Sequence, residues 1–235
     1  MNPLIISVEG NIGSGKSTYV EILKQNLITI SNRPVVFLQE PVDEWSTIVD
    51  KQGESILSKF YANQKKYSFA FQMMAYISRL ALLKKTVEEN PDAIIITERC
   101  LFTDKYVFAK MLYDSNLIEE VEYAIYLKWF NTFQEEYPIS GYVYLYTRAE
   151  TAFERVKKRS RDGESTIPLD YLRQCHQYHN EWLVGNKSSI EDYIKNPDST
   201  STSGDLKILL LNAEEDIEAM KKKIPIIESF IQNKI

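Results

Sequence analysis

The segment with the clearest chemistry is Gly10-Asn11-Ile12-Gly13-Ser14-Gly15-Lys16-Ser17-Thr18, which follows the apolar run Leu4 to Val8. This spacing of glycines before Lys-Ser is typical of a phosphate-binding loop, because backbone N–H groups at glycines can curl around phosphate oxygens. The lysine then reaches the β- and γ-phosphates, and the serine hydroxyl can ligate Mg²⁺. The sequence therefore predicts that a nucleoside triphosphate, ATP or a similar one, binds here with Mg²⁺.

Carboxylates follow two further apolar runs. Val35 to Leu38 leads into Glu40, and Ala93 to Ile96 leads into Glu98 and Arg99. Ligands of an open parallel sheet bind beyond the carboxyl ends of its strands, so these side chains should share one cleft with the phosphate loop. Phosphoryl transfer needs a metal, a proton acceptor and cations at the migrating group. Glu98 suits the metal, together with the loop serine, and Glu40 suits the proton.

Three arginines that could close over a triphosphate come later in the chain. Arg155 and Arg159 are one helical turn apart, and Arg161 lies just past the expected helix end. Asp162-Gly163-Glu164 follows, which predicts a hinged, arginine-rich lid at about residues 155–167 that excludes water from the donor. The alternative is a solvated basic helix face.

The elements that must position these residues alternate between strand and helix. Apolar, β-branched runs predict strands at 4–8, 35–38, 93–96, 142–146 and 207–211, and helical patterns occupy 16–30, 64–89, 104–113, 119–137, 151–159 and 169–183. This order predicts one α/β domain over residues 1–235, with a five-stranded parallel sheet flanked by helices. Residues 196–204 are small and polar and predict a flexible loop. A last helical stretch, 214–232, should break at Pro225.

The composition and charge of the chain limit the kinds of partner that we expect. The formal net charge is −5, and the longest basic run is Lys221 to Lys223, so an electrostatic surface for nucleic acid is not expected. Two cysteines and two histidines show no metal-ligand spacing. No apolar stretch is long enough to cross a membrane, and a first strand at Leu4 leaves no room for a targeting segment. We expect a cytoplasmic protein that binds neither membrane nor nucleic acid.

Five blocks of sequence, in this order, resemble the deoxynucleoside kinase family, with deoxycytidine and deoxyguanosine kinases nearest. The blocks are Ser7-Val8-Glu9 with the phosphate loop, Glu40-Pro41-Val42 with Trp45, Ser68-Phe69-Ala70-Phe71-Gln72, Glu98-Arg99, and Ile167-Pro168-Leu169 with Tyr171 and Leu172. They extend over most of the chain, as far as about Leu183. The resemblance implies the P-loop kinase fold, transfer of the γ-phosphate of ATP to a deoxynucleoside 5′-hydroxyl, a role in nucleotide salvage, and a homodimer to which the two long helices could contribute a face.

The resemblance also implies roles for individual residues. Glu40 would be the general base, Arg99 would align that carboxylate with the transferred phosphoryl group, and Lys16 would complete the catalytic set. Gln72 would hydrogen-bond the base edge, because its amide offers both a donor and an acceptor. The remaining substrate contacts would be Phe71 and Phe108 on the base, Trp45 beside the sugar, and Tyr61 with Glu164 on the 3′-hydroxyl.

Base choice is predicted to depend on Arg79 and Asp104. Arg79 lies two helical turns after Gln72 and hence on the same helix face, and Asp104 opens the segment just beyond Glu98-Arg99. An ionised aspartate only accepts hydrogen bonds, so it would favour an exocyclic amino group and disfavour the carbonyl of thymine. Deoxycytidine and purine deoxynucleosides are therefore expected to be better substrates than thymidine.

Other nucleotide-binding proteins make different predictions. A thymidylate kinase would need a cation after the second strand to hold a substrate phosphate, where this chain has Glu40. A guanine-nucleotide switch would need D-x-x-G after an apolar strand, whereas Asp50-Lys51-Gln52-Gly53 follows none. A non-catalytic ATP-binding module would hydrolyse ATP without a phosphorylated nucleoside product.

Overall fold

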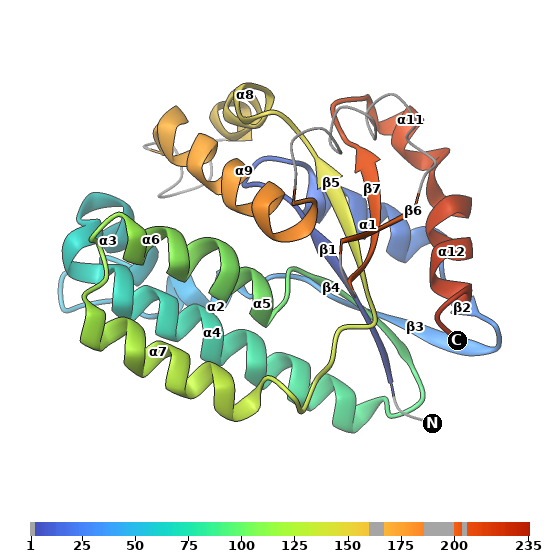
Figure 1. The fold of residues 1–235 in the computed structure, drawn as a ribbon, viewed down its shortest axis with the longest axis horizontal. Helices are drawn as coiled ribbons and strands as arrows, with labels where there is room; N and C mark the ends of the chain where they lie inside the picture. Colours follow the sequence, from blue (N-terminus) through green and yellow to red (C-terminus); the bar gives the residue numbers. More distant parts are fainter. Residues whose placement is uncertain (1–2, 160–166, 186–199, 204–205) are drawn as a thin grey trace.

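The protein folds around one twisted sheet with helices on both faces (Figure 1). The structure is a computed structural model, and it describes residues 3–159, 167–185, 200–203 and 206–235. Within these residues the sheet has seven strands in the order β2-β3-β4-β1-β5-β7-β6. The order reverses at β1, which is the point where an open parallel sheet places its ligand.

Five parallel strands form the interior of the sheet. They are β3 (Arg33–Leu38), β4 (Ile94–Glu98), β1 (Leu4–Glu9), β5 (Gly141–Tyr146) and β7 (Leu206–Asn212). The short strands β2 (Thr29–Ile30) and β6 (Thr200–Ser203) pair antiparallel at the two edges. The predicted parallel core is therefore confirmed, and the prediction missed both edge strands.

The two faces of the sheet carry different side chains, because successive residues of a strand point to opposite faces. On one face, aliphatic residues such as Ile6 and Val8 of β1 pack against α1 (Lys16–Asn26) and α12 (Ile224–Gln232). On the other face, tyrosines of β5 pack with the end of α9 (Leu169–Leu183). Both faces are buried, which is the usual environment of a parallel sheet.

A layer of helices carries most of the remaining core (Figure 1, left). Leu83 of this layer packs on Ile5 of β1 and Ile95 of β4. The two longest members of the layer, α4 (Gln64–Glu89) and α7 (Glu120–Phe133), lie side by side. Shorter helices complete the layer: α2 (Val42–Thr47), α3 (Ile56–Ala62), α5 (Leu101–Thr103), η1 (Asp104–Ala109) and α6 (Lys110–Asp114). The helix α8 (Ala149–Arg159) lies next to α9 at the top of Figure 1, and α11 (Ile217–Lys221) lies at its upper right.

Several sequence predictions of element bounds were wrong. The helix expected over 16–30 ends at Asn26, because the chain turns into the hairpin β2–β3. The helix expected over 104–113 is preceded by α5 and begins as the π-helical turn η1. The loop expected over 196–204 contains β6, and its residues 196–199 and 204 lie outside the described residues. The helices α2 and α3 were not predicted.

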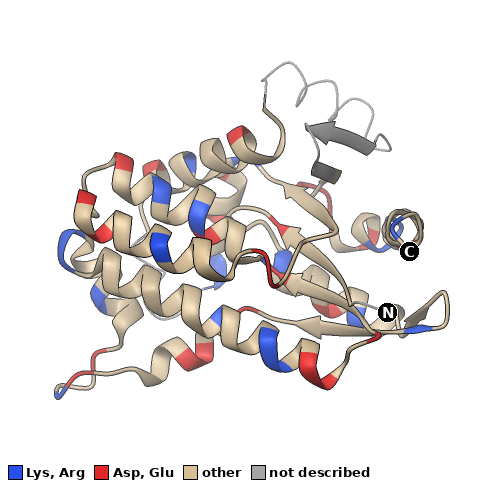
Figure 2. Ribbon diagram, turned by 60° about the horizontal axis from the view of Figure 1, so that its bottom comes forward, with Lys and Arg blue, Asp and Glu red and all other residues tan. Residues whose placement is uncertain are grey.

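Basic and acidic positions are interspersed along the helices (Figure 2). Within the described part of the chain, no helix is both long enough and apolar enough to cross a membrane.

Candidate active site

A cavity of about 310 Å³ lies beyond the carboxyl ends of β1, β3 and β4. The phosphate loop forms one of its walls, and residues of α2, α3, α4, η1 and α9 contribute to the others. It gathers most of the predicted site residues, which are Ile12, Gly13, Gly15, Lys16, Ser17, Thr18, Glu40, Trp45, Tyr61, Phe71, Gln72, Arg79, Glu98, Arg99, Asp104, Phe108 and Arg159. Three separate strand ends therefore converge as the sequence predicts.

The phosphate loop depends on its glycines at two close approaches. Gly10 has φ +150°, and a Cβ there would lie 2.6 Å from Ser14 Oγ and 2.8 Å from the Leu145 carbonyl. Gly13 has φ +80°, and a Cβ there would overlap the Ala152 carbonyl of α8. A side chain at either position would push the loop away from the sheet or from α8. These glycines thus hold the loop in the gap between the sheet and α8.

Lys16 lies at the bottom of this loop and is almost completely buried. Its Nζ donates a hydrogen bond to the Asn11 carbonyl at 2.8 Å. Burial and, next, the nearby Arg99 together lower the pKa of Lys16 to about 7, against the opposite effect of Glu98 and Glu40. A phosphate group beside Nζ would favour the charged form of the lysine.

Ser17 and Glu98 bring a hydroxyl and a carboxylate together on the floor of the cavity. Ser17 Oγ donates to Glu98 Oε1 at 2.8 Å, although the two residues are 81 positions apart. Both oxygens are hard ligands of the kind that Mg²⁺ prefers. No cluster of three or more His, Cys, Asp or Glu side chains that could hold a metal occurs among the described residues. A metal here would need phosphate oxygens to complete its coordination.

Glu40 is held by two arginines. Arg99 Nη1 lies 2.6 Å from Glu40 Oε2, and Arg79 Nη2 lies 2.9 Å from Glu40 Oε1. Burial alone would raise the pKa of Glu40, but Arg99, Arg79 and Lys16 outweigh it and hold that pKa at about 2. Glu40 is therefore a carboxylate across the whole neutral range, with one guanidinium on each oxygen.

Arg99 reaches Glu40 from a strained backbone. Its φ is +60°, in the left-handed region that costs a non-glycine residue about 1–2 kcal/mol. The conformation is fixed by hydrogen bonds from Arg99 N to the Val8 carbonyl at 3.0 Å and from Thr97 Oγ1 to the Arg99 carbonyl at 2.8 Å. The guanidinium also lies over the Phe108 ring, 5.1 Å from its centroid. The strained residue itself lines the cavity, and backbone strain of this kind is common at functional sites.

Arg79 and Asp104 form a buried ion pair beside the cavity. Arg79 Nε donates to Asp104 Oδ2 at 2.9 Å, and Nη1 donates to the Glu98 carbonyl at 3.1 Å. Both side chains are at most 5% exposed. Burial raises the pKa of Asp104 above its usual value, although Arg79 opposes this shift. This ion pair is therefore buried and does not lie at the surface.

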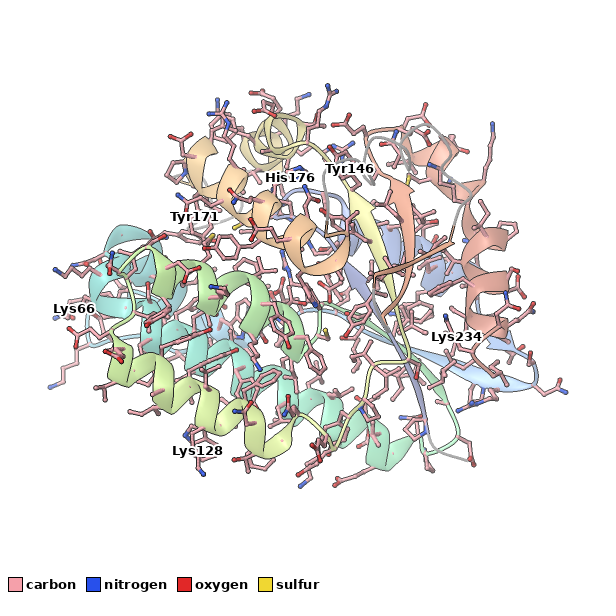
Figure 3. The ribbon with its side chains drawn as sticks, in the orientation of Figure 1. Lys66, Lys128, Tyr146, Tyr171, His176 and Lys234 are labelled. Atoms are coloured by element: carbon pink, nitrogen blue, oxygen red, sulfur yellow. The ribbon has the colours of Figure 1, made fainter. Side chains whose placement is uncertain are left out.

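Aromatic rings line much of the cavity wall. Phe71 stacks on Phe60 at 4.6 Å between centroids and meets Trp45 edge-on at 5.4 Å. Tyr171, labelled in Figure 3, comes from α9 and meets Tyr61 of α3 edge-on at 6.4 Å. Together the rings form an apolar slot of the kind that accepts a flat ring system.

Gln72 offers an unused polar group in this slot. The side chain is buried, and its Oε1 has no hydrogen-bond partner among the described residues. Buried polar atoms in proteins are nearly always paired, so an unpaired amide oxygen at a cavity wall is a ready acceptor for a ligand.

A second cavity, of about 820 Å³, lies on the other side of the phosphate loop. Arg155 and Arg159 line it together with the loop between β7 and α11. Arg155 Nη1 donates to the Ala213 carbonyl at 2.9 Å and to the Ser14 carbonyl at 3.4 Å. Arg155 thus ties α8 to the phosphate loop, and Gly15 lines both cavities.

Two predicted residues, Arg161 and Glu164, lie outside the described residues. The sequence analysis missed Phe60 and, as a wall residue, Tyr171, both of which line the first cavity. A ring at either position looks like ordinary core packing in a single sequence, so no signal distinguishes them. It also missed the contact of Arg79 with Glu40.

Comparison with known proteins agrees with this site. A family model described as deoxynucleoside kinase matches residues 6–232. The chain belongs to the deoxynucleoside kinase family. It is 33% identical to deoxycytidine kinase of Homo sapiens over 91% of this chain and 85% of that protein. It is 30% identical to mitochondrial deoxyguanosine kinase of Xenopus laevis over 91% and 82%, and 32% identical to deoxycytidine kinase 2 of Gallus gallus over 96% and 89%.

Membership confirms the resemblance seen in the sequence and the P-loop kinase fold. This member of the family is a phosphotransferase that acts on a hydroxyl group, takes a nucleotide as phosphate donor and serves nucleoside salvage.

Proposed function

We propose that this kinase transfers the γ-phosphate of ATP to the 5′-hydroxyl of deoxycytidine and of purine deoxynucleosides, and that thymidine is a poor substrate. The observation that carries the proposal is the buried Arg79–Asp104 pair, which lies beside Gln72 in the cavity that also holds Glu40. Relatives named deoxycytidine and deoxyguanosine kinases support the same choice of substrates.

Glu40 would accept the proton of the 5′-hydroxyl while Arg99 holds its second oxygen and faces the migrating phosphoryl group. A carboxylate with a pKa of about 2 is a weak base. It can still serve, because phosphoryl transfer passes through a loose transition state in which positioning and charge stabilisation supply most of the catalysis. Lys16 would neutralise charge on the β- and γ-phosphates.

Ser17 and Glu98 would hold Mg²⁺, since their oxygens already lie side by side at the loop. At these oxygens Mg²⁺ would supply positive charge that neutralises the donor phosphates. The donor nucleoside would lie in the second cavity, between Arg155, Arg159 and the β7–α11 loop. Arg161 would add a further cation from the lid, outside the described residues.

The base would lie between Phe71 and Phe108, with Gln72 on its edge and Asp104 accepting from an exocyclic amino group. Trp45 would flank the sugar. Tyr61 lines the cavity, and we assign it to the 3′-hydroxyl together with Glu164, which lies outside the described residues. These groups would leave no room for the 2′-hydroxyl of a ribonucleoside, so we expect the enzyme to prefer deoxyribose.

The test is a steady-state panel of the four natural deoxynucleosides, the matching ribonucleosides and thymidine monophosphate with ATP and Mg²⁺. We expect product from deoxycytidine and the purine deoxynucleosides, and kcat/KM for thymidine lower by at least about tenfold. A wild-type preference for thymidine would overturn the assignment of base choice. Activity on thymidine monophosphate alone would indicate a nucleotide kinase, and ATP hydrolysis without any phosphorylated nucleoside would indicate a binding module.

A double variant tests the assignment of Arg79 and Asp104 to base choice. Replacing Arg79→Met together with Asp104→Ala should raise the ratio of thymidine to deoxycytidine kcat/KM by at least about tenfold, the scale of one lost repulsive contact. Because Arg79 also contacts Glu40, the double variant should lose activity on every substrate. Such a general loss does not change the ratio of the two kcat/KM values, so the ratio reports base choice alone. An unchanged ratio would show that another group reads the base.

We also propose that the enzyme is a homodimer through α4 and α7. Val121, Ile125 and Trp129 lie one helical turn apart along α7 and are 70%, 44% and 45% exposed. Ile77 of α4, also exposed, adds to the apolar face. Patches of this kind mark association sites. A cytoplasmic location and the absence of nucleic-acid and membrane partners stay predictions from the sequence.

A further inference from the structure

A carboxyl group with no role in the chemistry above lies behind the cavity, at the last residue of β1. Glu9 is completely buried. Ser7 Oγ donates to it at 2.5 Å, Thr103 Oγ1 at 2.7 Å and Cys100 Sγ at 3.3 Å. All these donors are uncharged, and a carboxyl buried among neutral groups is costly unless its hydrogen bonds are well made. Its place in the fold therefore needs an explanation beyond packing.

The groups that Glu9 contacts are sequence neighbours of the site residues. Cys100 follows Arg99 directly, and Thr103 precedes Asp104 directly. On its own strand, Glu9 lies between Val8 and Gly10. The Val8 carbonyl accepts from Arg99 N at 3.0 Å, and the Gly10 carbonyl accepts from Arg99 Nη2 at 3.4 Å. Glu9 thus connects the end of β1 to Cys100 and Thr103, the two residues that lie next to Arg99 and Asp104 in the sequence.

The hydrogen bonds to Glu9 come from residues that directly follow the strained turn at Arg99. Thr103 Oγ1 contacts both oxygens of Glu9 at 2.7 Å and also accepts from Cys100 N at 3.1 Å. A left-handed, non-glycine residue persists only when its surroundings hold it there. The residue that follows Arg99 is therefore tied, through Thr103, to Glu9.

Charge acts in the same direction. Arg99 and Lys16 are neighbouring cations that disfavour each other's charged form. The Glu9 carboxylate raises the pKa of both groups. A negative charge behind the cavity therefore helps to keep two cations close together in front of it.

We propose that Glu9 is a positioning residue, which holds Arg99 in its left-handed conformation against Glu40 through Thr103 and Cys100. The inference rests on the proposed role of Glu40 and Arg99 at the acceptor hydroxyl. It assigns Glu9 no contact with substrate.

The variant Glu9→Gln keeps the size of the side chain but replaces one acceptor oxygen with a donor, which cannot pair with the Thr103 hydroxyl in its present direction. We expect kcat with deoxycytidine to fall at least about tenfold while KM changes less than about threefold, because Arg99 and Glu40 act on the reacting groups more than on the bound nucleoside. The control is Ser7→Ala. It removes a donor to Glu9 but leaves the Thr103 and Cys100 contacts, and it should keep kcat within about twofold.

A second variant covers the case in which Glu9→Gln does not fold. Thr103→Val removes the hydroxyl at constant shape and should lower kcat in the same way, while Thr103→Ser, which keeps the hydroxyl, should restore it. In a double-mutant cycle the Glu9→Gln and Thr103→Val effects on kcat should be non-additive.

A purely structural role would instead lower the thermal midpoint and leave kcat unchanged well below it. Wild-type kcat in a folded Glu9→Gln enzyme, or additive effects in the cycle, would overturn the inference. Retained activity in Glu40→Gln would instead overturn the proposed acceptor site, so the two failures are distinguishable.

Discussion

Arg79 Nη2 lies 2.9 Å from Glu40 Oε1, so the guanidinium that holds Asp104 also holds the proposed proton acceptor. One side chain on α4 therefore links the group that would read the base to the group that would activate the 5′-hydroxyl. Because buried charge networks respond as a unit, substitutions at Arg79, Asp104 and Glu40 should be coupled. A change made to alter base choice at Arg79 will also lower turnover.

Replacing Glu40→Gln keeps the shape of the side chain and removes the proposed base. We expect kcat to fall by about 10² or more with little change in nucleoside affinity. The thermal midpoint should fall as well, since Arg79 and Arg99 lose their shared buried counter-charge. Circular dichroism checks the fold, and the exposed Glu44→Gln on α2 is the control. Turnover close to that of the wild type would remove Glu40 from the mechanism.

The pKa of Glu40 gives a pH test. Its pKa is about 2, so protonation of this carboxylate should lower kcat/KM only near that pH. Removing the Arg79 cation raises that pKa, so Arg79→Met should move the acid limb of kcat/KM to higher pH by at least about one unit. Asp104→Asn leaves Arg79 on Glu40 and should not move the limb upward. Identical profiles for the wild type and Arg79→Met would show that another group limits activity in acid.

Lys16→Met should abolish turnover, by at least about 10²-fold, because it removes the cation expected at the β- and γ-phosphates. Stability should stay the same or rise, since burial of the ammonium already lowers the pKa of Lys16 to about 7 and methionine avoids that desolvation. A coupled assay measures the loss of turnover, and a thermal melt measures the change in stability. Lys24→Met, on the exposed side of α1, should change neither. Retained activity would contradict the assignment of the phosphate loop.

The parallel core and the phosphate loop could be predicted because each depends on local sequence. β1 is a continuous apolar run, and Gly10 to Ser17 has one well-known spacing. The contact of Arg79 with Glu40 could not be predicted, since it joins α4 to the end of β3 and depends on how the two pack. The role of Glu9 was hidden for the same reason. Its partners Cys100 and Thr103 are about ninety positions away, and the left-handed turn at Arg99 has no glycine to mark it.

Both cysteines should be inert in the folded enzyme. Cys100 and Cys175 are buried, and burial raises the pKa of Cys175 to about 12. At pH 8 only about one Cys175 thiol in 10⁴ is then ionised. An aromatic disulfide reagent should therefore find no thiol in the native protein and two per chain in denaturant. Rapid reaction of one native thiol would show that the fold opens at that cysteine.

The oligomeric state tests the apolar face of α7. Sedimentation of the wild type at micromolar concentration should give twice the chain mass of 27.4 kDa. Val121→Glu with Trp129→Glu places two carboxylates on that face, where unpaired charges would be buried in a dimer, so the double variant should sediment as a monomer. Neither residue lines the cavity, and the variant should keep its fold. The control is Lys128→Ala, an exposed neighbour on the same helix that is labelled in Figure 3. A wild-type monomer, or a double variant that stays dimeric, would exclude this face as the interface.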